Sequence, residues 1–264
     1  MDEAGGAASM TAPAIAWQWG DVDARDADGE TWLTHRHAGA RLRVRDGRLF
    51  REAGYASADA SVRRELARVG AIVRLRQRGR YLIHAAGVVD PRGRGWLLAG
   101  DSGSGKSTLA YALARRGWTV LGDDGVLVER SRGGAGLVAR GWHEPLRVSQ
   151  RLAGSFPEVL GSGLAPLPND PRERVSIATG KANTAPVAAL ILLERAASFA
   201  IAPLGAVSAL AALVRQSPWV ILGDEHARAH LELLRYAAAQ RVFRLSHTPA
   251  ELHTIGAVLQ EAVA

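Results

Sequence analysis

The sequence contains no cysteine among its 264 residues. Disulfide bonds, thiolate nucleophiles and cysteine-ligated zinc or iron–sulfur sites are therefore excluded, and the chain is compatible with a reducing compartment. Long apolar runs are also missing, since none approaches the roughly 18 residues of a membrane span, and the start MDEAGGAASM lacks the basic and apolar regions of a secretory signal. We therefore expect a cytoplasmic protein with no membrane partner.

Lysine is scarce: of 33 basic residues only Lys106 and Lys181 are lysines. Arginine supplies the rest, and thirteen arginines lie in residues 31–84 against four acids, within a formal net charge of +7. This basic stretch raises the alternative of a nucleic-acid-binding module. Aromatic residues make up only 6% of the chain, however, and no aromatic series for base stacking interleaves with these arginines. We therefore expect these arginines to lie on solvent-exposed faces of the protein, and we do not expect a nucleic-acid partner.

Turn signals and polarity patterns predict two domains. Residues 1–70 are expected to form a small β-rich region, in which the first ~15 residues are disordered. It should contain a hairpin at Asp46-Gly47 and an arginine-rich helix around Ser61–Val69. Residues 71–264 are expected to form an α/β domain of the P-loop type, because apolar runs there alternate with helical segments.

The predicted strands of this second domain are apolar runs bounded by turn residues. They are AIVRLRQ (71–77), YLIHAAGVV (81–89), GWLLAG (95–100), WTVLG (118–122), VLVER (126–130), PVAALILL (186–193) and RVFRLS (241–246). Helices are predicted over residues 106–117 and 226–240, and after a capping box formed by Thr248 and Glu251. The proline-rich segment 162–174 predicts a loop.

One segment matches a phosphate-binding loop. Gly100–Ser107 fits the pattern G-x-x-x-x-G-K-[ST], follows an apolar strand and opens a helix, which is the context that the motif requires. Glycines let successive backbone N–H groups face a polyphosphate, Lys106 adds a point charge, and the Ser107 hydroxyl can ligate Mg²⁺. The expected nucleotide-binding residues are Gly100, Asp101, Ser102, Gly103, Ser104, Gly105, Lys106, Ser107 and Thr108.

Two further positions carry candidate chemistry. Asp123 and Asp124 end the apolar run after the loop, and carboxylates there can serve as metal ligands or as a base for an attacking hydroxyl. The alternative is that Asp123-Asp124-Gly125 is only a hairpin turn. His84 is the one polar residue inside its apolar run, and a structural core histidine is the more common explanation of such a residue.

The combination of HAAGVV, GDSGSGKST and RRGWTVLGDD resembles the catalytic domain of HPr kinase/phosphorylase, from His84 to about Arg130. The resemblance implies a P-loop kinase core that uses ATP and Mg²⁺. It makes Ser107 a Mg²⁺ ligand and Asp123 the base that faces the acceptor serine. Asp124, nearer the metal, and His84 would be neighbours of that base at the phosphate end.

The rest of the chain matches this family more loosely. Lys181, within Thr179–Asn183, could stand in for a family arginine that reaches the transferred phosphate, although a surface turn explains the segment equally well. Glu144 is a further candidate metal ligand. The family's Leu-Glu-Ile-Arg-Gly signature has no counterpart after the aspartate pair, which puts the reverse, phosphorolytic reaction in doubt.

The short N-terminal region looks more like the stand-alone relatives found with lasso-peptide biosynthesis, which phosphorylate a serine at the C-terminal end of a precursor peptide. We therefore expect an ATP- and Mg²⁺-dependent serine kinase whose partner is a peptide or small protein. A homo-oligomer is compatible with the sequence. The alternative function is a P-loop nucleotide sensor or ATPase that transfers no phosphate to another molecule.

Overall fold

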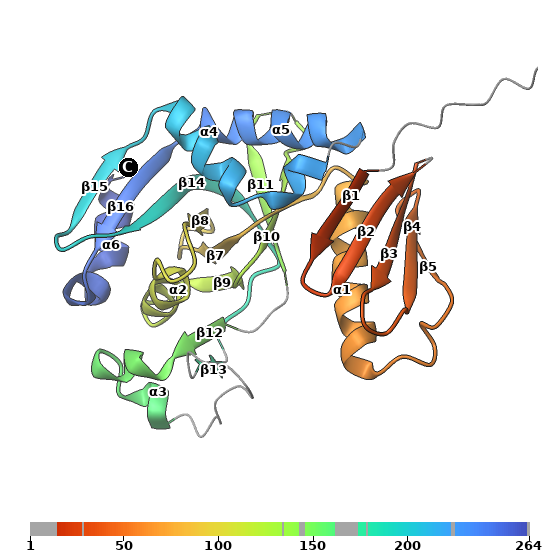
Figure 1. Cartoon of the computed structure of the whole chain (residues 1–264). Coiled ribbons are helices and arrows are strands. Elements are labelled where there is room, and N and C mark those ends of the chain that lie inside the picture. Colours follow the sequence, from red (N-terminus) through yellow and green to blue (C-terminus); the bar gives the residue numbers. More distant parts are fainter. Residues whose placement is uncertain are drawn as a thin grey trace, which may run out of the picture. The chain divides into compact units, whose positions relative to one another are not determined.

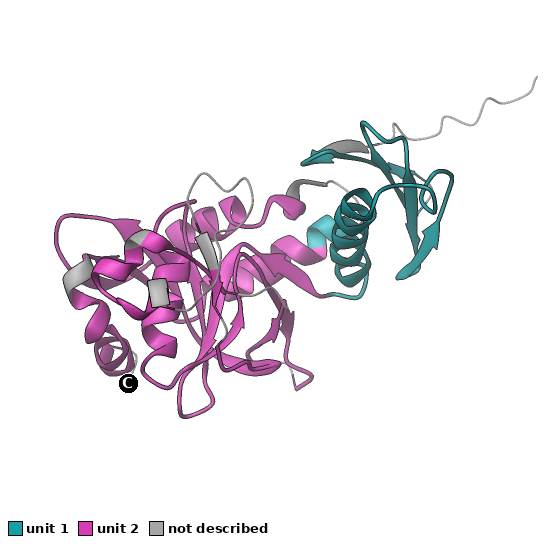
Figure 2. Cartoon of the chain, turned by 90° about the horizontal axis from the view of Figure 1, so that it is seen from below, with its two compact units in different colours: residues 1–79, 221–228 teal, residues 80–220, 229–264 magenta. Residues whose placement is uncertain are grey.

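The computed structural model describes residues 15–27, 29–133, 135–142, 146–161, 174–177, 179–222 and 225–262. Its contacts divide the chain into two compact units, which Figure 2 colours separately. The N-terminal unit comprises residues 1–79 with 221–228, and the main unit comprises residues 80–220 with 229–264. Two predictions concern segments that lie almost wholly outside the described residues: the disorder of the first ~15 residues and the loop over residues 162–174.

The N-terminal unit is an antiparallel five-stranded sheet with one helix, α1 (Ala60–Arg76). The strands follow chain order: β1 (Ile15–Trp19), β2 (Val22–Ala27), β3 (Glu30–His35), β4 (Arg41–Arg45) and β5 (Arg48–Arg51). Asp46 and Gly47 join β4 to β5 with φ angles of 49° and 65°, the left-handed pair that a two-residue hairpin turn requires. The predicted β-rich region and its hairpin are confirmed.

The prediction of a strand over residues 71–77 is wrong, because this segment continues α1 to Arg76. Its β-branched residues suit a strand by propensity alone. However, Leu66, Val69 and Val73 are all buried, and their spacing places them on one helix face, which packs on the sheet. Burial of that face outweighs the local propensity, and the expected domain boundary after residue 70 falls inside the helix.

Arginines of β4 form ion pairs with acids of the same unit. Arg43 forms ion pairs with Glu30 at 2.8 Å and with Glu52 at 2.9 Å. Its guanidinium also lies over the rings of Trp32 and Phe50, with ring-centre distances of 5.2 and 4.7 Å. The structure thus brings aromatic side chains among the arginines, contrary to the sequence pattern, but they stack on an arginine of the same sheet.

The main unit contains a mixed nine-stranded sheet (Figure 1). Its long strand β14 (Thr184–Arg195) runs antiparallel to β11 (Leu137–Gly141) and parallel to β8 (Gly95–Ala99) and β16 (Val242–His247). The other strands are β6 (Tyr81–Ile83), β7 (Ala85–Val89), β9 (Thr119–Gly122), β10 (Val126–Arg130) and β15 (Ala200–Pro203). A separate pair joins β12 (Leu146–Ser149) to β13 (Arg174–Ile177).

Helices cover both faces of this sheet, so the chain has the predicted α/β fold with a β-rich N-terminal region. The α-helices of the main unit are α2 (Lys106–Ala114), α3 (Glu158–Gly161), α4 (Ala206–Arg215), α5 (Glu225–Ala238, of which the main unit holds Ala229 onward) and α6 (Ile255–Ala262). Short 3₁₀ helices are η1 (Gln150–Gly154), η2 (Pro218–Leu222) and η3 (Pro249–His253). None of the helices in the described ranges has the length and hydropathy of a membrane span.

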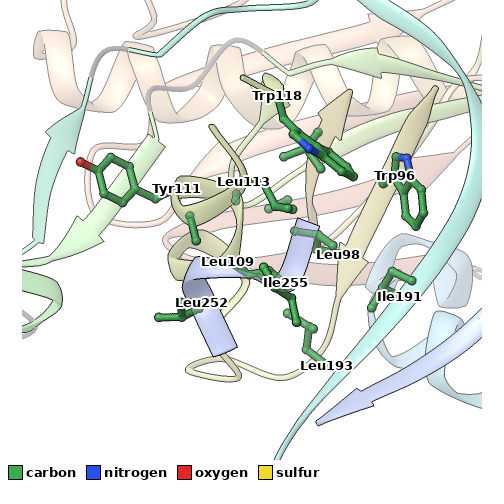
Figure 3. Close-up of a cluster of buried hydrophobic side chains, with 14 of the residues drawn as sticks. Trp96, Leu98, Leu109, Tyr111, Leu113, Trp118, Ile191, Leu193, Leu252 and Ile255 are labelled. Carbon is green, nitrogen blue, oxygen red and sulfur yellow. The ribbon is translucent and has the colours of Figure 1, made fainter. Parts of the chain in front are cut away.

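The main unit has two hydrophobic clusters, and alternate residues of a strand belong to different clusters. Trp96 and Leu98 of β8 join one cluster, and Leu97 joins the other. The first cluster holds α2 and the C-terminal segment against the sheet, and Figure 3 shows Leu252 and Ile255 of that segment near Leu109 of α2. The second contains buried residues of α4 and α5. This packing fixes the strand that leads into the phosphate loop.

Candidate active site

The phosphate-loop motif connects β8 directly to α2. Gly100, Gly103 and Gly105 have φ angles of 148°, 83° and 103°, which L side chains rarely adopt. A Cβ at Gly100 would also lie 2.7 Å from the backbone oxygen of Leu193. The glycines are therefore required both by the backbone conformation and by the close approach of the loop to β14.

Lys106 is 5% exposed and turns back onto the loop. Its Nζ atom donates hydrogen bonds to the carbonyl oxygens of Gly100, at 2.7 Å, and Asp101, at 3.1 Å. These contacts place the positive charge inside the curve of the loop, where a phosphate chain would be held.

Asp123 lies beside Ser107, the second residue of the loop with a predicted function. Its carboxylate accepts hydrogen bonds from the Ser107 hydroxyl, at 2.8 Å, and from the backbone N–H of Arg147, at 2.9 Å. The residue is 1% exposed. Burial and, secondarily, the neighbouring charge of Asp124 raise the pKa of Asp123 from 3.8 to about 6. A cation bound next to this carboxylate would favour its charged form.

Asp124 adopts a φ angle of 60° and lines a cavity together with His84 and Lys106. The His84 Nδ1 atom lies 3.1 Å from the Asp124 carbonyl oxygen, and this contact is a hydrogen bond when Nδ1 carries the proton. Burial, and then the charge of Lys106, lowers the pKa of His84 below its usual 6.5. The imidazole is therefore neutral near pH 7, and Nε2 is left as an acceptor.

The aspartate pair is not a hairpin turn. It connects β9 to β10, but β9 pairs with β7, whereas β10 pairs with β6 and β11. The chain crosses between separate positions of the sheet at Asp123 and Asp124. This crossing leaves the pair at the phosphate loop, and the alternative of a simple turn is excluded.

The cavity has a volume of about 1050 Å³ and extends beyond the motif. Several of the residues that line it were not predicted from the sequence. Besides Asp101 to Thr108, it is lined by His84, Asp124, Arg147, Val148, Ser149, Leu152, Ser155, Leu193, Glu194, Arg195 and Leu252. A signal existed for part of this set, because ligands of parallel sheets bind at the carboxyl ends of the strands. Glu194 and Arg195 directly follow the predicted strand PVAALILL and end the observed β14.

Comparison with known proteins gives one curated relative. The HPr kinase/phosphorylase of Chlorobium phaeobacteroides (strain BS1) is 36% identical to the chain over 84 residues, which are 32% of this chain and 22% of that protein. Over this segment the chain is similar to HPr kinase/phosphorylase. The resemblance seen in the sequence motifs is confirmed at this level, although the match spans only about a fifth of the relative's length.

A solved structure is also similar to the chain. The HPr(Ser) kinase/phosphatase from Coxiella burnetii is similar over 69% of this chain and 94% of that chain, with 14% sequence identity and a TM-score of 0.35. No family model matches the chain.

Two residues that the sequence places at the site lie elsewhere or outside the described residues. Lys181 forms a bridge with Val120 and lines a small pocket with Thr179 and Gly122, and it is not among the residues that line the large cavity. Glu144 belongs to residues 143–145, which lie outside the described part of the chain.

The oxygen atoms of Ser107 and Asp123 are suitable ligands for Mg²⁺. Ser107 and Asp123 offer hard oxygen ligands 2.8 Å apart beside the phosphate loop, and magnesium is commonly held by one or two carboxylates together with phosphates and water.

Proposed function

We propose that the chain transfers the γ-phosphoryl group of ATP to a serine of a peptide or small protein, with Mg²⁺ as cofactor. One observation carries this proposal: Lys106, Asp124 and His84 line a single open cavity. A phosphate loop alone serves many nucleotide-dependent functions. A loop that shares a cavity of about 1050 Å³ with a carboxylate has room for a second substrate next to the phosphates.

We assign the two aspartates the opposite roles from those that the resemblance implies. Asp123 is buried and bound to Ser107, so it belongs with the metal, whereas Asp124 lines the cavity. When bound at Ser107 and Asp123, Mg²⁺ would supply positive charge that stabilises the phosphates during transfer.

In the proposed reaction the serine hydroxyl oxygen bonds to the γ-phosphorus. The bond from that phosphorus to the β–γ bridging oxygen breaks, and ADP leaves. The serine proton passes to the Asp124 carboxylate. His84 acts as a positioning residue, because its Nδ1 atom contacts the Asp124 carbonyl oxygen and supports the left-handed backbone there.

The acceptor that we propose is a serine near the C-terminal end of a short precursor peptide, as in the lasso-peptide kinases that the chain resembles. The open cavity supports an acceptor that enters as an exposed chain end. Because the family signature linked to phosphorolysis is missing from the sequence, we propose forward transfer without efficient reversal.

Labelled ATP tests the function and the division of roles together. We expect label on the peptide with the wild-type chain, and a fall of about 10²-fold or more with Asp124→Asn at unchanged ATP affinity, the scale of general-base catalysis. Asp123→Asn should instead raise the Mg²⁺ concentration needed for half-maximal transfer.

Two results would count against this proposal. Label released as phosphate without reaching any peptide would favour the nucleotide sensor or ATPase. Loss of transfer in Asp123→Asn at saturating Mg²⁺, with near-normal transfer in Asp124→Asn, would restore the roles that the resemblance implies.

A further inference from the structure

Gln216 contacts two segments that line the large cavity, although it is not itself among the residues that line it. It directly follows α4 and is 6% exposed. Its backbone oxygen accepts a 2.7 Å hydrogen bond from the His84 N–H group, and its Nε2 atom donates a 3.1 Å hydrogen bond to the Asp101 carboxylate. One buried residue therefore connects the phosphate loop to the segment that carries His84.

The backbone contact pairs two groups that regular secondary structure leaves without partners. The last carbonyl groups of an α-helix have no acceptor role within the helix, and Pro218 prevents α4 from continuing past Gln216. His84 lies between β6 and β7, which pair with different strands, so it belongs to neither ladder. The hydrogen bond between these two groups attaches His84 to the C-terminal end of α4.

Packing keeps this end of α4 in a fixed place. Ala209 and Leu213 of α4 are fully buried, and they belong to the same hydrophobic cluster as Leu97 of β8. The phosphate loop directly follows β8. The helix and the loop are therefore supported by one core, on which a single hydrogen bond can set their relative position.

The side-chain contact acts on the phosphate loop itself. The Asp101 carbonyl oxygen accepts hydrogen bonds from Lys106 Nζ, at 3.1 Å, and from the Ser104 N–H group, at 3.0 Å. A donor to the Asp101 carboxylate fixes the orientation of this residue, because hydrogen bonds to ionised groups are the stronger ones. Gln216 thereby also fixes one of the two carbonyl oxygens that hold Lys106.

The same residue reaches Asp124 through His84. The His84 Nδ1 atom lies 3.1 Å from the Asp124 carbonyl oxygen. A continuous series of contacts therefore runs from Asp101 through Gln216 and His84 to Asp124. Its two ends are the loop that would hold the phosphates and the carboxylate to which we assign the serine proton.

We propose that Gln216 is a positioning residue that sets the separation between the phosphate loop and Asp124, an inference that rests on the proposed function. A displacement of about 1 Å between reacting groups can lower a rate about 100-fold. Gln216 should therefore influence turnover more than nucleotide affinity, since the affinity depends on loop N–H groups and on Lys106, which the substitution leaves in the chain.

Labelled ATP and a synthetic peptide with a C-terminal serine test the proposal on the full chain. Gln216→Leu keeps the backbone contact and a similar volume but removes the amide donor. It should lower kcat about tenfold, the scale of one hydrogen bond, and leave the KM for ATP within about twofold. Gln216→Glu should lower kcat further, because it places a second carboxylate against Asp101.

An exchange of the two groups gives a result that general destabilisation would not produce. In the double variant Asp101→Asn with Gln216→Glu, an amide again faces a carboxylate, with donor and acceptor exchanged. The double variant should therefore recover at least about fivefold in kcat over Gln216→Glu alone, as expected for directly coupled residues.

Gln240→Leu is the matched control, because it removes an exposed amide whose 3.2 Å hydrogen bond goes to the Tyr236 carbonyl oxygen. It should leave kcat unchanged. Hydrogen exchange with Mg²⁺·ATP and no peptide adds a readout that does not require transfer: Gln216→Leu should speed exchange in residues 100–106, and the control should not.

The outcomes separate the two proposals. Unchanged kcat in Gln216→Leu, no recovery in the double variant, or equal exchange of the loop in Gln216→Leu and the control would each overturn the positioning role. A wild-type chain that labels no peptide, while the exchange difference persists, would overturn the proposed function and support the effect of Gln216 on the loop.

Discussion

Lys106 is a point charge in a chain that otherwise uses arginine almost everywhere. Its Nζ atom donates to the Gly100 and Asp101 carbonyl oxygens, an arrangement that suits a compact ammonium better than a planar guanidinium. We expect Lys106→Ala to weaken Mg²⁺·ATP binding about 10- to 100-fold, since hydrogen bonds to a charged group contribute about 1.5–3 kcal/mol. Lys106→Arg should recover only part of the affinity in calorimetry. Unchanged binding in both variants would contradict the phosphate-loop assignment.

Asp123 makes stability depend on pH. Because its pKa is raised to about 6 in the folded chain, the folded state binds the proton more tightly than the unfolded state. Its stabilising contribution is therefore complete below about pH 4 and is lost as pH rises through 6. We expect Asp123→Asn to reduce the loss of unfolding free energy between pH 4 and 7.5 by up to about 3 kcal/mol, since one pKa unit is worth about 1.4 kcal/mol.

Chemical unfolding of both proteins at several pH values measures this difference. Added Mg²⁺ should stabilise the wild-type chain at pH 7.5 and affect the variant much less, because the cation favours the charged carboxylate. Parallel pH profiles of the two proteins would show that Asp123 is not the buried acid described above.

At the scale of elements, the aspartate pair depends on a close crossing of the chain. A Cβ at Gly122, the last residue of β9, would lie 2.7 Å from the Gly125 oxygen and 2.9 Å from the Trp142 oxygen. Both are backbone atoms, which cannot rotate away. We expect Gly122→Ala to lower the free energy of unfolding by about 1–3 kcal/mol and to reduce phosphoryl transfer by moving Asp123 and Asp124.

Gly133→Ala is the matched control, because a Cβ there meets nothing within 4 Å. Denaturant unfolding should place this control within about 0.5 kcal/mol of wild type. A Gly122→Ala chain as stable and active as the control would show that the crossing tolerates a side chain.

At the scale of the whole molecule, the two units have separate hydrophobic cores. Both large clusters belong to the main unit, while α1 packs on the sheet of the N-terminal unit. Since a ligand at 100 times its dissociation constant adds about 2.7 kcal/mol to the state that binds it, Mg²⁺·ATP should protect the main unit selectively. Hydrogen exchange should slow in β8 and α2 and stay unchanged in α1. Equal slowing in both units would indicate that they unfold together.

Local sequence patterns were enough to predict those parts of the structure that depend on residues close together in the chain. The glycines and Lys106 of the phosphate loop follow from backbone geometry and charge within eight residues, and the Asp46-Gly47 turn follows from its need for positive φ angles. The aspartate pair was found because it ends an apolar run. The sequence by itself therefore determined the conformation of the phosphate-loop motif and the α/β class.

Tertiary packing decided the rest, because it depends on contacts between residues far apart in the chain. Residues 71–76 became helix through burial of one face, against their strand propensity. Parallel pairing of β14 and β16 brought Arg195 and His247 to the loop, and no local pattern carries that pairing. Which aspartate binds Ser107 and which lines the cavity follows from the crossing after Gly122, where adjacent residues point to different surroundings.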